Sequence, residues 1–137
     1  MKKYEQFDIS GDAGLRIWGK DLEELLVNAA EGLGELITDL SSIKETEKRE
    51  VVLSSERNED LLVKWLNELI FLFDTYGFVG TKFEVNLKSD TLNATVSGGI
   101  FNIETNEGRL LVKAATYHGL SLKRDDAGWD AVVVFDI

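Results

Sequence analysis

The longest helical pattern in the sequence is Asn58-Glu59-Asp60-Leu61-Leu62-Val63-Lys64-Trp65-Leu66-Asn67-Glu68-Leu69-Ile70-Phe71-Leu72-Phe73-Asp74-Thr75-Tyr76. Its apolar residues recur at intervals of three and four, as on one face of a helix: Leu62, Trp65, Leu66, Leu69 and Phe73. Further apolar residues widen this stripe beyond one face, so we expect the helix to be buried on more than one side. Asn58 is expected to cap its start, and Gly77 to end it.

A second helix is predicted upstream, from about Asp21 to Thr38, with Asp21 and Glu24 spaced as in a capping box. Gly32 and Gly34 interrupt its pattern and are expected either to allow close packing or to end the regular part of the helix early. Alternating or apolar runs predict the strands, at 3–9, 13–18, 51–53, 82–88, 91–97, 109–122 and 129–136. Ser10-Gly11-Asp12 is predicted to be a turn between the first two strands.

Two helices among strands in hairpin order indicate the α+β class. We expect two main helices packed on one face of a mixed, mainly antiparallel sheet of about six or seven strands. The chain has 137 residues, and no repeat or linker divides it, so residues 1–137 are predicted to form a single domain.

The charge balance restricts the partners of the protein. Fifteen Lys and Arg residues against 25 Asp and Glu residues give a formal net charge of −10. Such a field repels a polyanion, and so disfavours direct binding to nucleic acid. An acidic surface can serve solubility alone, a basic protein partner or a hard cation.

Residue content excludes several kinds of site. The chain has no cysteine and one histidine, His118, which excludes thiolate chemistry and a multi-histidine zinc site. A serine triad would have to use His118, and the sequence lacks a G-x-S-x-G motif, so we interpret His118 as a satisfied structural residue. There is no signal peptide and no membrane-spanning run, which predicts a cytoplasmic protein.

Carboxylates remain as the candidate functional groups. The last strand ends in Asp136-Ile137, and if Ile137 is the native end its α-carboxylate lies one residue from the Asp136 side chain. These groups would repel each other unless a cation lay between them. Asp12 would be a third ligand if the first turn lies beside the last strand, and oxygen ligands select Ca²⁺, Mg²⁺ or Mn²⁺. Alternatively, sheet hydrogen bonds alone hold the last strand and Asp12 only forms the turn.

Three blocks of the sequence together resemble the archease family over nearly the full length of the chain. They are Leu61-Leu62-Val63-Lys64-Trp65-Leu66-Asn67-Glu68-Leu69 with Phe73-Asp74, then Val112-Lys113-Ala114-Ala115-Thr116-Tyr117-His118-Gly119-Leu120, and finally Gly128-Trp129 with Val132-Val133-Val134-Phe135-Asp136-Ile137. The N-terminal motif departs from the family pattern. The family typically has His-Thr-Ala-Asp where this chain has Ile9-Ser10-Gly11-Asp12, so the aspartate matches and the histidine is absent.

The resemblance implies an α+β fold and a metal site formed by Asp12, Asp136 and Ile137, with calcium expected and magnesium or manganese as alternatives. It also implies a protein partner, the RtcB-type GTP-dependent RNA ligase of tRNA splicing and RNA repair. Family members promote guanylylation of this ligase and its multiple turnover, so we expect a non-enzyme.

Two other functions stay open. The apolar face of residues 61–73 could serve a chaperone-like or scaffolding module. The carboxylates could alternatively form a metal-dependent hydrolase, although few residues are available for a base and a group that orients the nucleophile.

Overall fold

The computed structural model describes residues 2–137, in which eight strands and two α-helices follow one another along the chain. The order is β1 (Tyr4–Ile9), β2 (Asp12–Gly19), α1 (Leu22–Ile37), a 3-10 turn (Leu40–Ser42), β3 (Glu47–Ser54), α2 (Asn58–Tyr76), β4 (Phe78–Lys88), β5 (Thr91–Ile100), β6 (Ala114–Ala115), β7 (Ser121–Asp125) and β8 (Gly128–Asp136). The α+β class and the two main helices are confirmed. No helix within residues 2–137 is long and apolar enough to cross a membrane.

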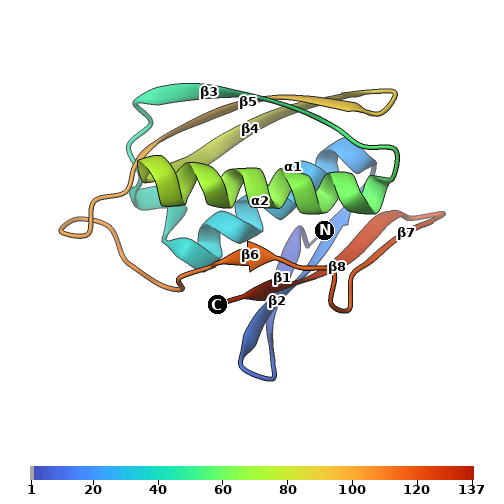
Figure 1. The fold of residues 1–137 in the computed structure, drawn as a ribbon, viewed down its shortest axis with the longest axis horizontal. Coiled ribbons are helices and arrows are strands. Elements are labelled where there is room, and N and C mark those ends of the chain that lie inside the picture. The colour runs from blue at the N-terminus through green and yellow to red at the C-terminus, as the bar shows by residue number, and fades with distance from the viewer. Residues whose placement is uncertain (1) are drawn as a thin grey trace.

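The strands form two antiparallel sheets rather than the single sheet that the sequence predicted. One sheet has the order β1-β2-β8-β6, with β7 also paired to β8, and the other has the order β3-β5-β4. Both helices lie between the two sheets (Figure 1). The expected layer of helices on one face of one sheet is therefore wrong. Because α2 is apolar around more than one face, a sheet can pack on each side of it, as the width of its stripe predicted.

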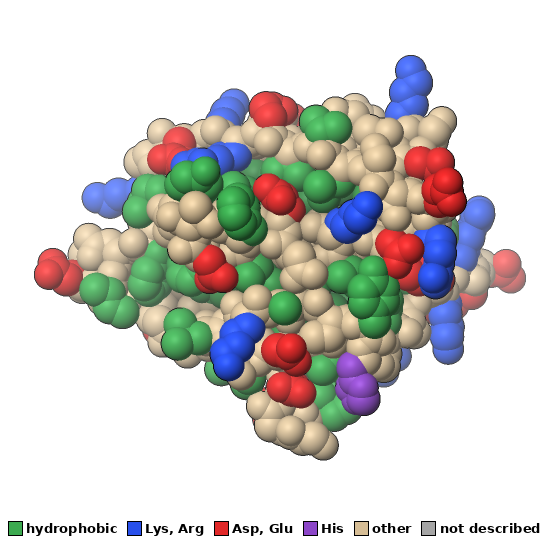
Figure 2. Space-filling model, in the orientation of Figure 1, with side chains coloured by type: hydrophobic (Ala, Val, Ile, Leu, Met, Phe, Trp, Pro, Cys, Tyr) green, Lys and Arg blue, Asp and Glu red, His purple; other side chains and the backbone are tan. Residues whose placement is uncertain are grey.

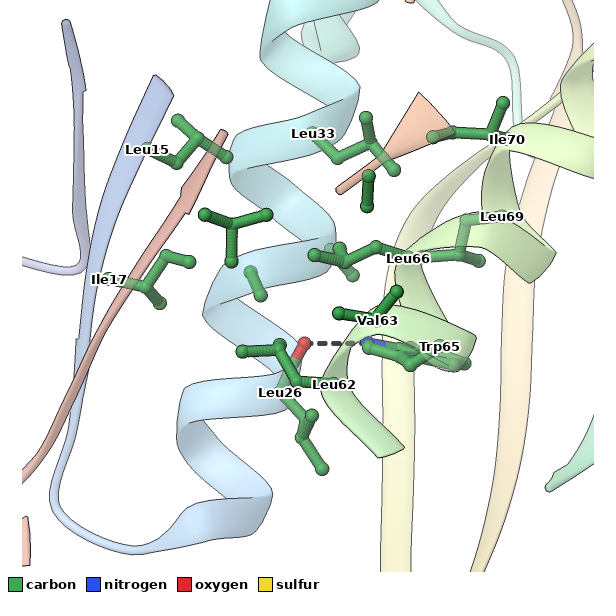
Figure 3. Packing of buried hydrophobic residues seen from close by; sticks show 14 of the residues in the cluster. Leu15, Ile17, Leu26, Leu33, Leu62, Val63, Trp65, Leu66, Leu69 and Ile70 are labelled. Atoms are coloured by element: carbon green, nitrogen blue, oxygen red, sulfur yellow. Dashed lines mark hydrogen bonds between the residues drawn. The ribbon is translucent and has the colours of Figure 1, made fainter. Parts of the chain in front are cut away.

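Trp65 lies at the centre of the core between the two sheets. Its side chain is fully buried, and its indole N–H donates to the carbonyl oxygen of Leu26 in α1 at 2.9 Å (Figure 3). The indole also meets the ring of Phe83 in β4 edge to face, with the ring centroids 6.2 Å apart. One side chain of α2 thus contacts both α1 and the β3-β5-β4 sheet.

The helix ends follow the sequence closely, with one shift. The Asp21 carboxylate accepts from the Glu24 N–H at 2.8 Å, which confirms the predicted N-cap of α1. Gly77 ends α2 in the left-handed conformation, at φ 70°, as expected. The N-cap of α2 is Arg57, whose side chain makes no capping hydrogen bond, so the predicted cap at Asn58 is wrong by one residue.

Two glycines of α1 lie where neighbouring side chains come very near the helix. A Cβ on Gly32 would meet Leu15 Cδ1 at 3.0 Å, and one on Gly34 would meet Leu40 Cδ2 at 2.7 Å. Their predicted role in close packing is confirmed.

The predicted strand over residues 109–122 is largely wrong. Only Ala114–Ala115 and the start of β7 are extended in a sheet there. The N–H groups of Arg109 and Leu110 donate instead to the carbonyls of Ile37 and Leu36, at 3.0 Å each, at the C-terminal end of α1. The segment thus satisfies carbonyls that a helix end leaves free, and does not pair with a strand at that point.

Candidate metal-binding site at the end of the last strand

Asp12 is placed by the tight hairpin between β1 and β2. Ser10 and Gly11 both have positive φ, 46° and 86°, and Ile9 pairs with Asp12 across the turn. Positive φ at both central residues is the pattern of a two-residue type I′ turn, whose twist matches that of the flanking strands. Asp12 is therefore the first residue of β2, half-buried, and not part of the turn itself.

The pairing of β2 with β8 brings Asp12 beside Asp136. Ala13 is opposite Phe135 in this antiparallel pair, so the next position along both strands places Asp12 across from Asp136. Residues opposite each other on neighbouring strands have Cβ atoms about 4.5–5.5 Å apart and share a face of the sheet. The predicted proximity of the early turn and the last strand is present, and Ile137 follows directly.

These acidic residues face away from the helices. Ala13 and Phe135 are buried, at 1% and 0% exposure, so their neighbours Asp12 and Asp136 lie on the opposite face of the sheet. Asp136 is exposed, and the side chain of Ile137 is 37% exposed. Acidic side chains lie next to one another just above the turn of the β1–β2 hairpin, at the lower edge of Figure 2.

The other edge of β8 is held by residues 113–116. The Lys113 N–H donates to the carbonyl oxygen of Asp136 at 2.8 Å. Thr116 donates both its N–H and its hydroxyl to the carbonyl oxygen of Val134, at 3.0 and 2.8 Å. The end of β8 is thus paired on both sides, although its last side chains are open to solvent.

The charges and donor atoms of this cluster suit a hard cation. Among residues 2–137, neither Asp12 nor Asp136 takes part in an ion pair. Adjacent carboxylates without a counter-charge favour a bound cation, and oxygen donors favour calcium, magnesium or manganese. No three His, Asp or Glu side chains of the described chain form a metal-binding group, so a third ligand would have to come from a main-chain oxygen or from the Ile137 carboxylate.

Ile9 occupies the position where a histidine is typical of the family that the chain resembles. Because Ile9 pairs directly with Asp12, a histidine there would lie beside the carboxylate. The apolar side chain of Ile9 provides neither a ligand nor a hydrogen bond.

His118 is not the satisfied structural residue that the sequence suggested. It lies in the exposed loop between β6 and β7, and its only hydrogen bond within the described chain is donated by its main-chain N–H to the Thr116 hydroxyl, at 3.3 Å. Among residues 2–137 the imidazole has no carboxylate or hydroxyl partner, so it is not oriented as a catalytic base.

Tyr117 anchors the same loop to α2. Its phenol donates to the Asp60 carboxylate at 2.8 Å, and this hydrogen bond is the main cause that raises the pKa of Tyr117. Neither this anchor nor the contacts of residues 113–116 with β8 could be predicted from the sequence, because both join segments far apart in the chain.

Comparisons with known proteins agree with this architecture. The model of the archease protein family matches residues 4–137. A protein of Saccharolobus islandicus named "Protein archease" is 40% identical, and one of Methanothermobacter thermautotrophicus with the same name is 39% identical, each over the whole of both chains.

Two solved structures are also similar over the full chain. The solution structure of Methanobacterium thermoautotrophicum protein 1598 has a TM-score of 0.80 at 37% identity and covers 100% of both chains. The crystal structure of a Thermotoga maritima protein, described as an archease and possible chaperone, has a TM-score of 0.69 at 28% identity and covers 100% of this chain and 98% of that one.

Proposed function

The chain belongs to the archease family, and on this premise we propose that it is an accessory protein that activates an RtcB-type, GTP-dependent RNA ligase. In this role it promotes guanylylation and repeated turnover of the ligase, in tRNA splicing or RNA repair in the cytoplasm. The single observation that supports the proposal is the β2–β8 register, in which Ala13 pairs with Phe135, so that Asp12 and Asp136 occupy the next position on the two strands.

The residues of this cluster would hold a divalent cation, with calcium expected. Asp12 and Asp136 supply carboxylate oxygens from neighbouring strands, and Ile137 supplies its α-carboxylate where it ends the mature chain. A bound cation would supply positive charge next to the phosphates of GTP in the ligase. Because both aspartates stand on paired strands, their positions are fixed before the partner binds.

The acidic composition fits an activator better than an RNA-binding protein. At a net charge of −10 the protein repels RNA phosphates, and so does not compete with the ligase for its substrate. The same charge attracts a ligase whose active site is cationic.

We assign the covalent chemistry to the ligase. The one histidine of this chain is exposed, and its imidazole lacks the orienting partner that a base or nucleophile needs. The purified protein is therefore expected to leave GTP and RNA unchanged.

The test is a ligase assay at fixed GTP and manganese, with guanylylation and multiple turnover as separate readouts. Asp12→Ala and Asp136→Ala are each expected to lose most of the stimulation. Asp126→Ala is the matched control, because it removes an exposed aspartate from the β7–β8 turn at the opposite end of β8. Full stimulation by both site variants would remove the cluster from the mechanism.

A chaperone-like or scaffolding role is the second candidate. The sequence bases this role on the apolar face of residues 61–73. Most of that face is buried in the core and cannot bind a partner. Phe71 and Tyr76 remain available on α2, each 50% exposed and in edge-to-face contact. Suppression of aggregation by the wild type, lost in Phe71→Ser and without any effect on ligase turnover, would favour this role.

A further inference from the structure

The short strand β6 has little main-chain pairing with other strands. It consists of Ala114 and Ala115, and it pairs with only one strand, at Asp136 and Phe135 of β8. The residues before it, from 101 to 113, belong to no helix or strand. A two-residue strand at a sheet edge is not stable by itself, so another contact has to hold it.

Asn67 of α2 supplies that contact. Its side-chain carbonyl oxygen accepts from the Ala115 N–H at 2.8 Å, and its amide nitrogen donates to the Ala115 carbonyl oxygen at 3.2 Å. One side chain thus pairs with both main-chain polar groups of a single residue, as a neighbouring strand would. Asparagine can do this because its amide both donates and accepts.

The helix that carries Asn67 is firmly fixed. Trp65 and Leu66, the two preceding residues, are both 0% exposed in the core. Asn67 is only half-buried and points to β6, which lies between α2 and the end of β8 (Figure 1). The Asn67 amide therefore links a helix that is fixed in the core to β6, at the edge of the candidate site.

The contacts continue from Ala115 to the acidic residues. On either side of Ala115 and its neighbour Ala114, Lys113 donates to the Asp136 carbonyl oxygen and Thr116 to the Val134 carbonyl oxygen. The burial of Ala115 and the hydrogen bond from Tyr117 to Asp60 also hold this segment, but Asn67 is the side chain that pairs with the main chain of β6 itself.

We propose that Asn67 is a positioning residue for the metal site: it holds β6 against β8 and so fixes Asp136 and Ile137 across from Asp12. This inference rests on the proposed function, since it assumes that these oxygens bind a cation. Asn67 itself contributes no ligand. Groups that orient metal ligands typically change metal affinity about 10- to 100-fold when they are removed.

The first test measures calcium binding by isothermal titration calorimetry. Asn67→Ala is expected to raise the dissociation constant about tenfold. Asn67→Gln, which keeps the amide one methylene further out, should recover part of the affinity. Lys64→Met is the matched control, because Lys64 lies on the same helix and donates to the Ser54 carbonyl oxygen at 2.8 Å, toward the other sheet. It should bind calcium as the wild type does.

The second test measures hydrogen exchange, and its first arm uses the wild type, so that arm does not depend on the variants folding. Since coupling between two equilibria is reciprocal, calcium must slow amide hydrogen exchange at Lys113 and Ala115 if the position of β6 controls the site. Asn67→Ala should speed exchange at the same two amides.

The outcomes separate the inference from the proposed function. If the wild type binds calcium and Asp136→Asn does not, unchanged affinity in Asn67→Ala, or unchanged exchange at Ala115 on adding calcium, overturns the role of Asn67 and leaves the metal site standing. If wild type and Asp136→Asn bind calcium equally, the proposed metal site is wrong, and the inference falls with it.

Discussion

The strongest structural prediction concerns Trp65, whose indole joins α2 to α1 and to the β3-β5-β4 sheet. Two variants separate its contributions. Trp65→Ala removes the whole side chain, whereas Trp65→Phe keeps an aromatic ring but removes the donor to Leu26 and part of the volume. Because Trp65 is 0% exposed, the cavity left by a smaller side chain lies inside the apolar core, where water is not stable.

The expected costs follow from these losses. Truncation of a buried Trp to Ala costs about 3–5 kcal/mol, and a net hydrogen bond contributes about 1 kcal/mol. The Leu26 carbonyl lies inside α1, where the helix supplies another donor, so Trp65→Phe leaves no unpaired acceptor. We therefore expect about 4 kcal/mol for Trp65→Ala and about 2 kcal/mol for Trp65→Phe. The larger value is a large part of a typical stability of about 5–15 kcal/mol.

Urea unfolding followed by far-ultraviolet circular dichroism measures both losses without relying on tryptophan fluorescence. The midpoint for Trp65→Phe should fall by about 1 M, given a urea dependence of about 2 kcal/mol per molar. Phe71→Leu is the control, because Phe71 lies on the same helix and is 50% exposed. A loss in Trp65→Ala no greater than that of the control would refute the central position of Trp65 in the core.

The metal site, the Tyr117 phenol and the Thr38 hydroxyl can each be tested by one measurement. Calcium at about 100 times its dissociation constant should stabilise the wild type by about 2.7 kcal/mol in calorimetric melting, and an equal shift in Asp136→Asn would contradict the site. Asp60→Asn should lower the pKa of Tyr117 toward its ordinary value of 10.0 in an alkaline absorbance titration read against Tyr117→Phe. Since the folded pKa of Tyr117 is raised, its contribution to stability is present below the unfolded pKa and is lost as pH rises through the folded one. Thr38→Val should stabilise the fold by about 1 kcal/mol in urea unfolding, because the buried Thr38 hydroxyl has no partner in the described chain, and destabilisation would show that the hydroxyl is satisfied.

The sequence predicted those elements whose cause is local. Asp21 and Gly77 mark helix ends because a side-chain acceptor and a positive φ are needed at those points, whatever the rest of the chain does. The Ser10-Gly11 turn is likewise a local requirement. The start of α2 is also decided locally, and the prediction there is wrong by only one residue: Asn58 is the first residue of the helix instead of its cap.

Errors arose where distant segments decide the structure. The apolar pattern of residues 109–122 predicts a strand, but the N–H groups of Arg109 and Leu110 donate to carbonyls at the end of α1. An alternating apolar pattern indicates which side chains are buried. It does not indicate which segments form main-chain hydrogen bonds with each other. The division into two sheets was missed for the same reason, because no local pattern states that β2 pairs with β8 while β3 pairs with β5.

The candidate site depends on both local sequence features and contacts between distant segments. The acidic chain end and the resemblance to the archease family point to Asp12, Asp136 and Ile137, but whether these residues lie close together depends on the β2–β8 register, which only the fold provides. Asn67 could not be selected at all, since an asparagine on a helix does not reveal the partner of its amide.

The replacement of the family's usual histidine by Ile9 is informative in this setting. Ile9 pairs with Asp12 and not with Asp136, so the change affects one edge of the cluster and leaves the β8 edge, held by residues 113–116, intact. A histidine at this position could only donate to or share a cation with Asp12. In the proposed site Asp12 has no such neighbour, so we expect the position of the site to depend more on the last strand and on the Asn67 amide that pairs with β6.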